Sequence, residues 1–383
     1  MQDERDFQVL ITRAGLIAGL VAGAVALTAC GSDNNGSSTA AGGGSSSSGG
    51  ASSSSTSINC ASGSLKSDGS TAQQNAMDQW IKDYQSSCSG ATVNYGGGGS
   101  GQGIKDFTNK QVDFAGSDAA LDPTKGEVAA AGQACGGAAI DLPMVTGPIA
   151  VGYNLKGADN LVFTPDVLAK IFTGKITTWN DPAIKAINSG ANLPATKITV
   201  FNRSDASGTT QNFERYLAAS APSVWTAKPD KTWAGTGQGK KGNQLVGQAV
   251  QATQGSIAYV EWSYAIQNNL QTGKIDNGAG AVELSADSAG KAVAAAKVAP
   301  NGPGDLSLKL DYATKTPGAY PIVLVTYEIV CAKYADSAKG SLVKSFMNYI
   351  SSTDAQNSVH DLGYAALPQS VQTQVQAAIN SIG

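Results

Sequence analysis

The sequence predicts an α/β fold of two lobes joined by two hinge crossings, with a ligand cleft between the lobes. The first observation is the alternation of strand and helix patterns from residue 58 on, which is typical of a mostly parallel sheet with helices on both faces. The second is a pair of long, apolar, β-branched segments, residues 140–154 and 320–330, which look like strands buried on both faces. If these two segments lie side by side, they form the crossings between the lobes.

Shorter elements precede the first crossing. Ala76, Trp80 and Tyr84 share one face of the first predicted helix. A cluster of glycines between residues 235 and 242 predicts a long surface loop. In order, the elements expected first are a helix (residues 72–86), a strand (91–95), a glycine-rich turn (96–103), a helix starting at Ile104 and a strand (112–115).

The two crossings divide the globular part of the chain. Lobe I is expected to be discontinuous and to comprise residues 58–147 plus 319–383. Lobe II is expected to comprise residues 148–318.

The N-terminus has the pattern of a secretory signal over residues 1–29. Arg5 and Arg13 precede a short apolar run that ends in small residues. That run is shorter than the roughly 20 apolar residues of a spanning helix. Leu27-Thr28-Ala29-Cys30 resembles the lipobox of bacterial lipoproteins, which implies that Cys30 becomes the lipid-modified first residue. The alternative is an ordinary signal peptide with a cysteine at its end by chance.

Residues 30–57 are expected to form a disordered linker that begins with the lipidated cysteine. The segment is mostly Gly, Ser and Ala and has no large apolar side chains to bury. A flexible chain of this length spans on the order of 30 Å. The expected location is therefore the outer face of the cytoplasmic membrane, with the protein anchored by lipid and not spanning the bilayer.

Composition excludes several classes of function. The net charge is only −3 and the basic residues are scattered, whereas a nucleic-acid-binding protein needs a basic face. The cysteine spacings are long and there is one histidine, so the sequence predicts no metal site. No cofactor is expected, and no Gly-x-x-x-x-Gly-Lys-Ser/Thr motif supports nucleotide hydrolysis.

Four cysteines remain once Cys30 is set aside, and an even number in an exported chain predicts two disulfides. The sequence does not fix their connectivity, and free buried thiols are the alternative. We favour the pairs Cys60–Cys88 and Cys135–Cys331; if the two crossings lie side by side, the second pair would tie them together near one end.

Three short segments place glycines and hydroxyl side chains where a helix is expected to begin. The N–H groups at a helix N-terminus have no partner within the helix and carry a partial positive charge, so they bind oxyanions. Each segment alone could be a simple helix cap. The segments are Gly69-Ser70-Thr71-Ala72, Gly99-Ser100-Gly101-Gln102-Gly103 and Arg203-Ser204-Asp205-Ala206-Ser207-Gly208-Thr209-Thr210.

Together these segments resemble the PstS-type phosphate-binding proteins, with similar order and spacing. The resemblance covers nearly all of the globular part. It continues through Val112-Asp113-Phe114-Ala115-Gly116-Ser117-Asp118, Gly174-Lys175-Ile176-Thr177-Thr178-Trp179-Asn180-Asp181, Gly255-Ser256-Ile257-Ala258-Tyr259-Val260-Glu261 and Gly363-Tyr364-Ala365-Ala366-Leu367-Pro368. It implies a type II periplasmic-binding-protein fold that closes about a hinge, a monomer without catalytic activity, and delivery of inorganic phosphate to the membrane permease subunits of an ABC-type importer.

The resemblance also implies a set of phosphate-binding residues from both lobes. Asp205 is implied to orient Arg203 by an ion pair. The family often has a bulkier aromatic residue where this chain has Ala72, which matters little if the contact is made by the backbone N–H. The implied ligands are Thr71, the backbone of Ala72, Ser100 and Asp118 from lobe I, and Arg203, Ser207, Gly208 and Thr209 from lobe II.

Asp118 is the member of this set that bears on selectivity. A carboxylate repels an anion in a desolvated cleft unless the ligand brings a proton. Phosphate keeps at least one proton at neutral pH and can donate its O–H to Asp118, whereas sulfate has none. A site built to accept a hydrogen bond rejects an analogue that lacks the donor. The alternative is that Asp118 is only a helix cap or a surface residue.

Three other functions stay open at this point. The chain could bind another oxyanion such as sulfate or molybdate. It could be a secreted phosphatase, although it lacks Gly-x-Ser-x-Gly and a His/Asp cluster, and His360 is expected on a helix surface. It could also be a surface interaction protein without a ligand, using Trp179, Trp225, Trp233 and Trp262, most of which are more simply expected in the lobe cores.

Overall fold

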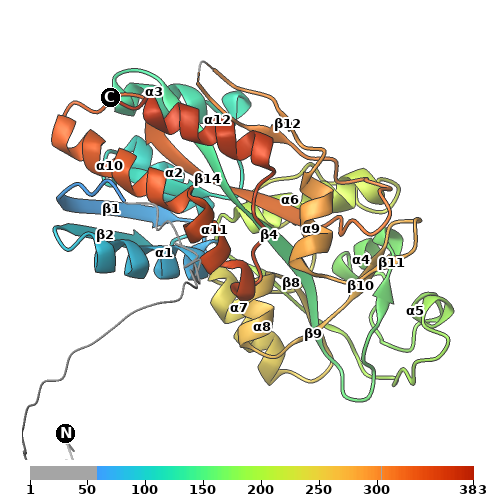
Figure 1. Cartoon of the computed structure of the whole chain (residues 1–383). Helices are drawn as coiled ribbons and strands as arrows, with labels where there is room; N and C mark the ends of the chain where they lie inside the picture. Colours follow the sequence, from blue (N-terminus) through green and yellow to red (C-terminus); the bar gives the residue numbers. More distant parts are fainter. Residues whose placement is uncertain (1–57, 303) are drawn as a thin grey trace, which may run out of the picture. The chain divides into compact units, whose positions relative to one another are not determined.

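The computed structural model of the protein describes residues 58–302 and 304–383, so the expected signal segment, Cys30 and the linker lie outside the described residues. Figure 1 shows the order of elements along the chain. The strands are β1 (Gly63–Gly69), β2 (Ala91–Gly96), β3 (Phe114–Ser117), β4 (Ala139–Asn154), β5 (Val162–Phe163), β6 (Thr199–Arg203), β7 (Gln238–Lys240), β8 (Ser256–Glu261), β9 (Gln271–Thr272), β10 (Lys274–Asp276), β11 (Ala281–Val282), β12 (Lys297–Val298), β13 (Leu308–Lys309) and β14 (Val323–Cys331).

The helices alternate with these strands. The α-helices are α1 (Gln74–Ser87), α2 (Ser100–Thr108), α3 (Glu127–Cys135), α4 (Pro165–Phe172), α5 (Pro182–Ile187), α6 (Gly208–Ser220), α7 (Gly242–Ala252), α8 (Trp262–Gln267), α9 (Ala286–Val293), α10 (Ser337–Ile350), α11 (Thr353–Ser358) and α12 (Gln369–Asn380). Two 3-10 helices, η1 (Pro123–Lys125) and η2 (His360–Leu362), complete the described elements.

One sheet runs through both lobes in the order β2-β1-β3-β14-β4-β8-β6-β7, with β9 also paired to β4. Within lobe I, β1 pairs in parallel with β2 and β3; within lobe II, β6 pairs in parallel with β7 and β8. The pairs that involve β4 and β14 are antiparallel. The expectation of a mostly parallel sheet therefore holds inside each lobe but is wrong at the centre, where the two crossing strands run in opposite directions.

The two crossing strands lie side by side, as expected from their apolar sequences. β14 pairs with β4 from Val323↔Pro148 to Cys331↔Ala139, and every residue of β14 is buried. The disulfide Cys135–Cys331 ties the end of β14 to α3, just before β4 begins, and Cys60–Cys88 forms the second bridge. Both disulfides therefore have the pairing that we favoured from the sequence.

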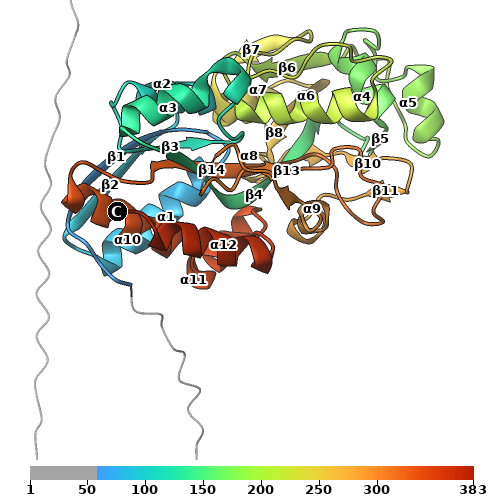
Figure 2. The ribbon, with the colours of Figure 1, turned by 90° about the horizontal axis from the view of Figure 1, so that it is seen from above.

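Helices cover both faces of the sheet. Figure 2 shows α2 and α3 on one side of the lobe I strands and α1, α10 and α12 on the other, while α4 and α6 cover lobe II. Ala76, Trp80 and Tyr84 are completely buried along one face of α1, as the sequence pattern predicts. No helix within residues 58–302 and 304–383 is long and apolar enough to cross a membrane.

Two local expectations, both in glycine-rich segments, are wrong. α2 begins at Ser100 and not at Ile104, and it lies so close to β1 that a side chain on Gly103 would come within 2.6 Å of the β1 backbone. The glycine cluster at residues 235–242 is only partly a loop. It includes β7, and Gly242 is the first residue of α7.

Candidate functional site

The loops before α1 and α6 and the start of α2 meet between the two lobes. The N–H of Gly208 in lobe II donates to Ser100 Oγ in lobe I at 3.1 Å. The hydroxyl of Thr209 donates to Asp118 Oδ2 across the same boundary at 2.9 Å. The expected site residues are at most 5% exposed, so the structure is closed around them; these are Thr71, Ala72, Ser100, Asp118, Arg203, Ser207 and Thr209.

The hydroxyl hydrogen of Ser100 is available to a ligand. Its Oγ accepts two backbone N–H bonds, from Asp118 and from Gly208, each at 3.1 Å. A hydroxyl has two acceptor lone pairs and one donor hydrogen, so its accepting capacity is full. Within the described residues Ser100 donates to no protein atom, which leaves its O–H to donate to a bound anion.

Asp118 is buried and accepts hydrogen bonds on both carboxylate oxygens. Ser70 donates to Oδ1 and Thr209 donates to Oδ2. Burial raises the pKa of Asp118 above its usual value, while the bonds from Ser70 and Thr209 and the charge of Arg203 oppose that rise. A carboxylate has about four acceptor sites. Asp118 therefore keeps the capacity to accept one further donor, such as the O–H of a protonated oxyanion.

Arg203 supplies a fixed positive charge from the end of β6. Its side chain is 1% exposed, and its Nε donates to Asp205 Oδ1 at 2.8 Å within a two-point ion pair. Burial raises the pKa of Asp205, but the hydrogen bond and charge of Arg203 outweigh it and lower the pKa overall. The ion pair between Arg203 and Asp205 that the sequence led us to expect is thus present.

Gly208 allows the two lobes to approach each other closely. A Cβ at this position would lie 2.6 Å from Asp118 Cβ and 2.7 Å from Ser100 Oγ, closer than real Cβ contacts. Ser207 caps α6 by accepting the N–H of Thr210 at 3.2 Å. The α6 N-terminus thus enters the site directly, and any larger residue at Gly208 would push the lobes apart.

Thr71 and Ala72 lie on the lobe I side of the site and contact it in different ways. Thr71 Oγ1 accepts the backbone N–H of Asn243 from lobe II at 3.2 Å. The N–H of Ala72 donates to Ser70 Oγ at 2.9 Å, so within the closed structure it is engaged inside lobe I. The role of Ala72 in binding an anion stays a prediction.

Two residues at the site carry roles that sequence reasoning did not assign. Ser70 bridges the Ala72 N–H and the Asp118 carboxylate. Asn243 contacts Thr71 and Thr209, which belong to different lobes. Ser70 lay within a recognised segment, whereas the signal for Asn243 was only a glycine followed by a polar residue at a helix start.

Two buried glutamates lie beside the site, and neither forms an ion pair with any residue that the structure describes. Burial, and then the charge of Asp118, raise the pKa of Glu261 to about 8, against the effect of bonds from Ser263. Burial likewise raises the pKa of Glu328, in the crossing strand β14, well above its usual value. With a pKa of about 8, the carboxyl of Glu261 is mostly neutral in the folded protein near neutral pH.

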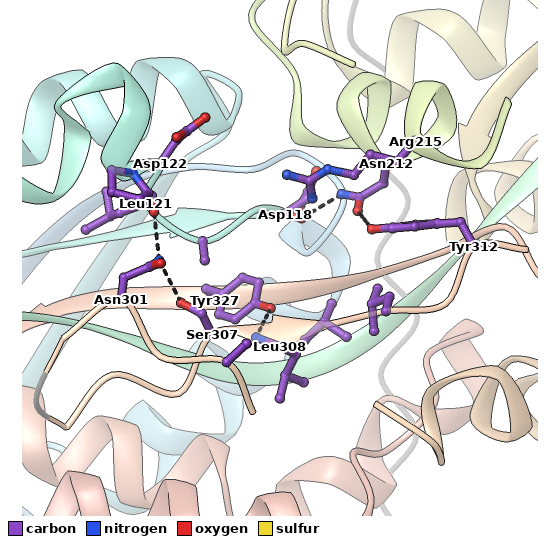
Figure 3. Close-up of a pocket in the computed structure, with 15 residues that line it drawn as sticks. Asp118, Leu121, Asp122, Asn212, Arg215, Asn301, Ser307, Leu308, Tyr312 and Tyr327 are labelled. Carbon is purple, nitrogen blue, oxygen red and sulfur yellow. Dashed lines mark hydrogen bonds between the residues drawn. The ribbon is translucent and has the colours of Figure 1, made fainter. Parts of the chain in front are cut away.

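A cavity of about 260 Å³ lies beside the site and is lined from both lobes (Figure 3). Asn212 lines this cavity, and its Nδ2 donates to the carbonyl oxygen of Asp118 at 2.6 Å and to that of Gly208 at 2.9 Å. Arg215 and Tyr312 line the cavity on the lobe II side. Asp118 belongs both to the lining of this cavity and to the site.

The arrangement is suited to holding a small oxyanion. It combines helix N-termini, a buried arginine and a hydroxyl with a free hydrogen. Among residues 58–302 and 304–383, no group of three or more His, Cys, Asp or Glu side chains is placed to hold a metal ion. His360 is exposed on η2, in line with the expected surface position.

Comparison with known proteins identifies the family. A model of the PBP superfamily domain matches residues 54–354. The phosphate-binding protein PstS2 of Mycobacterium bovis is 44% identical over 369 residues, which cover 95% of this chain and 96% of the relative. The chain belongs to the PstS family. A second PstS-family relative, phosphate-binding protein PstS 3 of Mycobacterium leprae, is 43% identical over 378 residues and is covered to 99%.

Solved structures show the same fold as this PstS-family chain. A periplasmic phosphate-binding protein, PfluDING, solved with bound phosphate, matches with a TM-score of 0.66 and 22% identity over 82% of this chain and 93% of its own. A phosphate-binding protein from Stenotrophomonas maltophilia matches with a TM-score of 0.63 and 20% identity over 82% and 94%. The expected two-lobed binding-protein fold is thus confirmed.

Proposed function

We propose that this chain binds inorganic phosphate outside the cytoplasm and delivers it to an ABC-type phosphate importer. The observation that carries the proposal is the closed site between the lobes, in which Asp118, Ser100 and Arg203 converge on the start of α6. The names of the PstS relatives support the same ligand.

The proposed binding mode divides the work between charge and hydrogen bonds. Arg203 and the N-termini of α2 and α6 offset the charge of the anion. The free hydroxyl hydrogen of Ser100 donates to one anion oxygen. Thr71, Ala72, Ser207, Gly208 and Thr209 are proposed to complete the set of ligands.

Asp118 is proposed to select an anion that carries a proton. Its carboxylate accepts the phosphate O–H, while the bonds from Ser70 and Thr209 hold it in place. Sulfate would face the same acceptor without a proton to donate, and an unpaired buried acceptor costs about 1–3 kcal/mol. Selection against sulfate therefore follows from the same residue that favours phosphate.

Binding is proposed to close the cleft about the two crossing strands. We place the exchange between lobes at residues 147/148 in β4 and 318/319 before β14. Closure brings the Arg203 segment to the Ser100 and Asp118 segments, a motion typical of two-lobed binding proteins.

We further propose that the chain acts as a monomer on the outer face of the cytoplasmic membrane. Residues 1–29 would direct export, Cys30 would carry the lipid, and residues 30–57 would tether the binding domain. These proposals rest on the sequence pattern alone. Mass spectrometry of the mature N-terminus would detect a lipid-modified Cys30, and an unmodified N-terminus at another residue would contradict the anchor.

Binding without turnover is part of the proposal. Ser100 Oγ accepts two backbone N–H bonds and, in the described chain, has no base that accepts its proton, as a nucleophile would need. Calorimetric titration of the purified chain with phosphate, sulfate and molybdate tests the function. We expect phosphate to bind and sulfate to bind far more weakly. Equal binding of phosphate and sulfate, or hydrolysis of p-nitrophenyl phosphate that Ser100→Ala abolishes, would overturn the proposal.

A further inference from the structure

The N-terminus of α7 reaches the site from lobe II, in addition to those of α2 and α6. The N–H of Gly242 donates to Asp205 Oδ1 at 3.0 Å, and the N–H of Asn243 donates to Thr71 Oγ1 at 3.2 Å. Both N–H groups are thus already bonded to protein. The feature that extends beyond the helix end is the side chain of Asn243, which is completely buried.

The chemistry around Asn243 fixes the orientation of its amide. The backbone N–H of Glu261 lies 3.0 Å from Oδ1, and because an N–H only donates, the facing atom must be the amide oxygen. The amide nitrogen then faces Thr71 Oγ1 at 3.0 Å and Thr209 Oγ1 at 3.4 Å. Its two hydrogens are therefore directed at one threonine of each lobe.

These bonds determine which way the Thr71 hydroxyl points. Thr71 Oγ1 accepts two N–H bonds from Asn243, one from the backbone and one from the amide. Both acceptor positions of the hydroxyl are then occupied, so its single hydrogen must be donated elsewhere. Ser100 reaches the same state through the N–H groups of Asp118 and Gly208.

We propose that Asn243 is a positioning residue that fixes Thr71 as a hydrogen-bond donor to the bound oxyanion. It does so across the lobe boundary, so the Thr71 hydroxyl is free to rotate when the cleft is open and is fixed when the cleft closes. The inference rests on the proposed function and deepens it. Asn243 acts through Thr71, because its own donors are taken up by the two threonines.

A double-mutant cycle between Asn243 and Thr71 tests this role. Asn243→Ala removes the amide, so Thr71 can turn its hydrogen away from the anion; we expect phosphate affinity to fall by about 10-fold, in the dissociation rate more than in the association rate. Thr71→Val removes the hydroxyl itself. In that background Asn243→Ala should change affinity by less than about 2-fold, because there is no hydroxyl left to orient.

An isosteric variant guards against loss of folding. Asn243→Asp keeps an oxygen to accept the Glu261 N–H, but it turns the group facing Thr71 from a donor into an acceptor. We expect a loss of about 100-fold or more, because Thr71 then donates to the new carboxylate and a negative charge faces the anion. Gln244→Glu is the matched control, since it makes the same amide-to-carboxylate change at the next, exposed position of α7.

The outcomes separate this inference from the proposed function. Wild-type affinity in Asn243→Asp, an equal loss in Gln244→Glu, or additive losses in the cycle would overturn the positioning role while phosphate binding stands. If the wild-type chain fails to bind phosphate in the same titrations, the proposed function fails, and the inference falls with it.

Discussion

Two of the regions where the lobes touch differ in chemistry. At the site, most cross-lobe contacts are hydrogen bonds between buried hydroxyl, amide and carboxylate groups, such as Thr209 to Asp118. At the rim, the contacts are ion pairs: Lys231–Glu127 at 2.7 Å, whose side chains are 7% and 17% exposed, and Lys125–Asp230, whose side chains are 39% and 44% exposed. The rim pairs join lobe I to lobe II through their charged side chains, while the backbone carbonyl of Lys231 also accepts the N–H of the site residue Ser207 at 2.8 Å.

The difference indicates a division of roles. Contacts at the rim attract the lobes to each other whatever the cleft contains, and salt weakens the exposed pair most. Contacts at the site contain a buried arginine, a buried carboxylate and hydroxyl hydrogens that have no protein acceptor in the described chain. The rim therefore contributes to closure of the cleft, and the site determines which anion is bound in the closed cleft.

The largest expected effect is at the site. Arg203→Ala removes the fixed positive charge and leaves the partly buried Asp205 without its partner, so phosphate affinity should fall by roughly 30- to 4,000-fold, equivalent to about 2–5 kcal/mol. Calorimetric titration measures the loss. Arg215→Ala is the matched control, because Arg215 lies on α6 but lines the neighbouring cavity. Near-normal affinity in Arg203→Ala would remove this residue from the site.

The second-largest expected effect is on the pH dependence of the free energy of unfolding, which should differ between the two regions. Glu261 is neutral in the fold up to its pKa of about 8 and ionises near pH 4.5 when the chain unfolds. Its contribution to the free energy of unfolding is therefore fully present below about pH 4.5 and is lost as pH rises to 8. Relative to wild type, Glu261→Gln should gain up to a few kcal/mol across that range in denaturant unfolding.

The rim should respond on the acid side. Burial raises the pKa of Asp230, but the hydrogen bond and the charge of Lys125 outweigh burial and lower this pKa overall. The contribution of Asp230 to the free energy of unfolding is therefore present at neutral pH and is lost in acid. The free energy of unfolding of Asp230→Asn should thus differ from that of wild type at neutral pH, and the two values should converge as the pH falls.

For Glu261→Gln, a free energy of unfolding that runs parallel to that of wild type from pH 4.5 to 8 would contradict the assignment of a neutral buried glutamate.

The smallest expected effect is at the rim. Glu127→Gln breaks the better-buried ion pair, and phosphate should dissociate up to about 10-fold faster, without a change in the preference for phosphate over sulfate. The exchanged pair Glu127→Lys with Lys231→Glu should restore much of the loss. Lys125→Ala, at the exposed pair, is the control and should change dissociation by less than about 3-fold at physiological salt. A change in anion preference in any of these variants would contradict the division of roles.

Features with a local pattern were accessible from the sequence. The crossing strands showed as long apolar runs, and the α6 segment placed Arg203 two residues from Asp205 and four residues from Ser207, within one turn region. The contact between Arg203 and Asp205 is made within one short loop, so it depends only on residues that are neighbours in the sequence. Gly208 was accessible in the same way, because a glycine at the start of a predicted helix indicates a position where another chain segment comes close.

Contacts made only by tertiary packing were not accessible. Asn243 meets Thr71 across 172 residues, and its helix start resembled a glycine-rich loop in the sequence. Ser70 and Asp118 are 48 residues apart. The raised pKa of Glu328 depends on complete burial in a crossing strand, and the sequence pattern of an isolated acid within an apolar run did not predict it.

The central claim is that Asp118 makes this site selective for an oxyanion that carries a proton. The most direct test is calorimetric titration of wild type and Asp118→Asn with phosphate and with sulfate, with Asp122→Asn as a control outside the site. We expect the phosphate-to-sulfate affinity ratio to fall by roughly 10- to 100-fold in Asp118→Asn, because the new amide donates to sulfate and no longer repels it. An unchanged ratio in Asp118→Asn would contradict the claim.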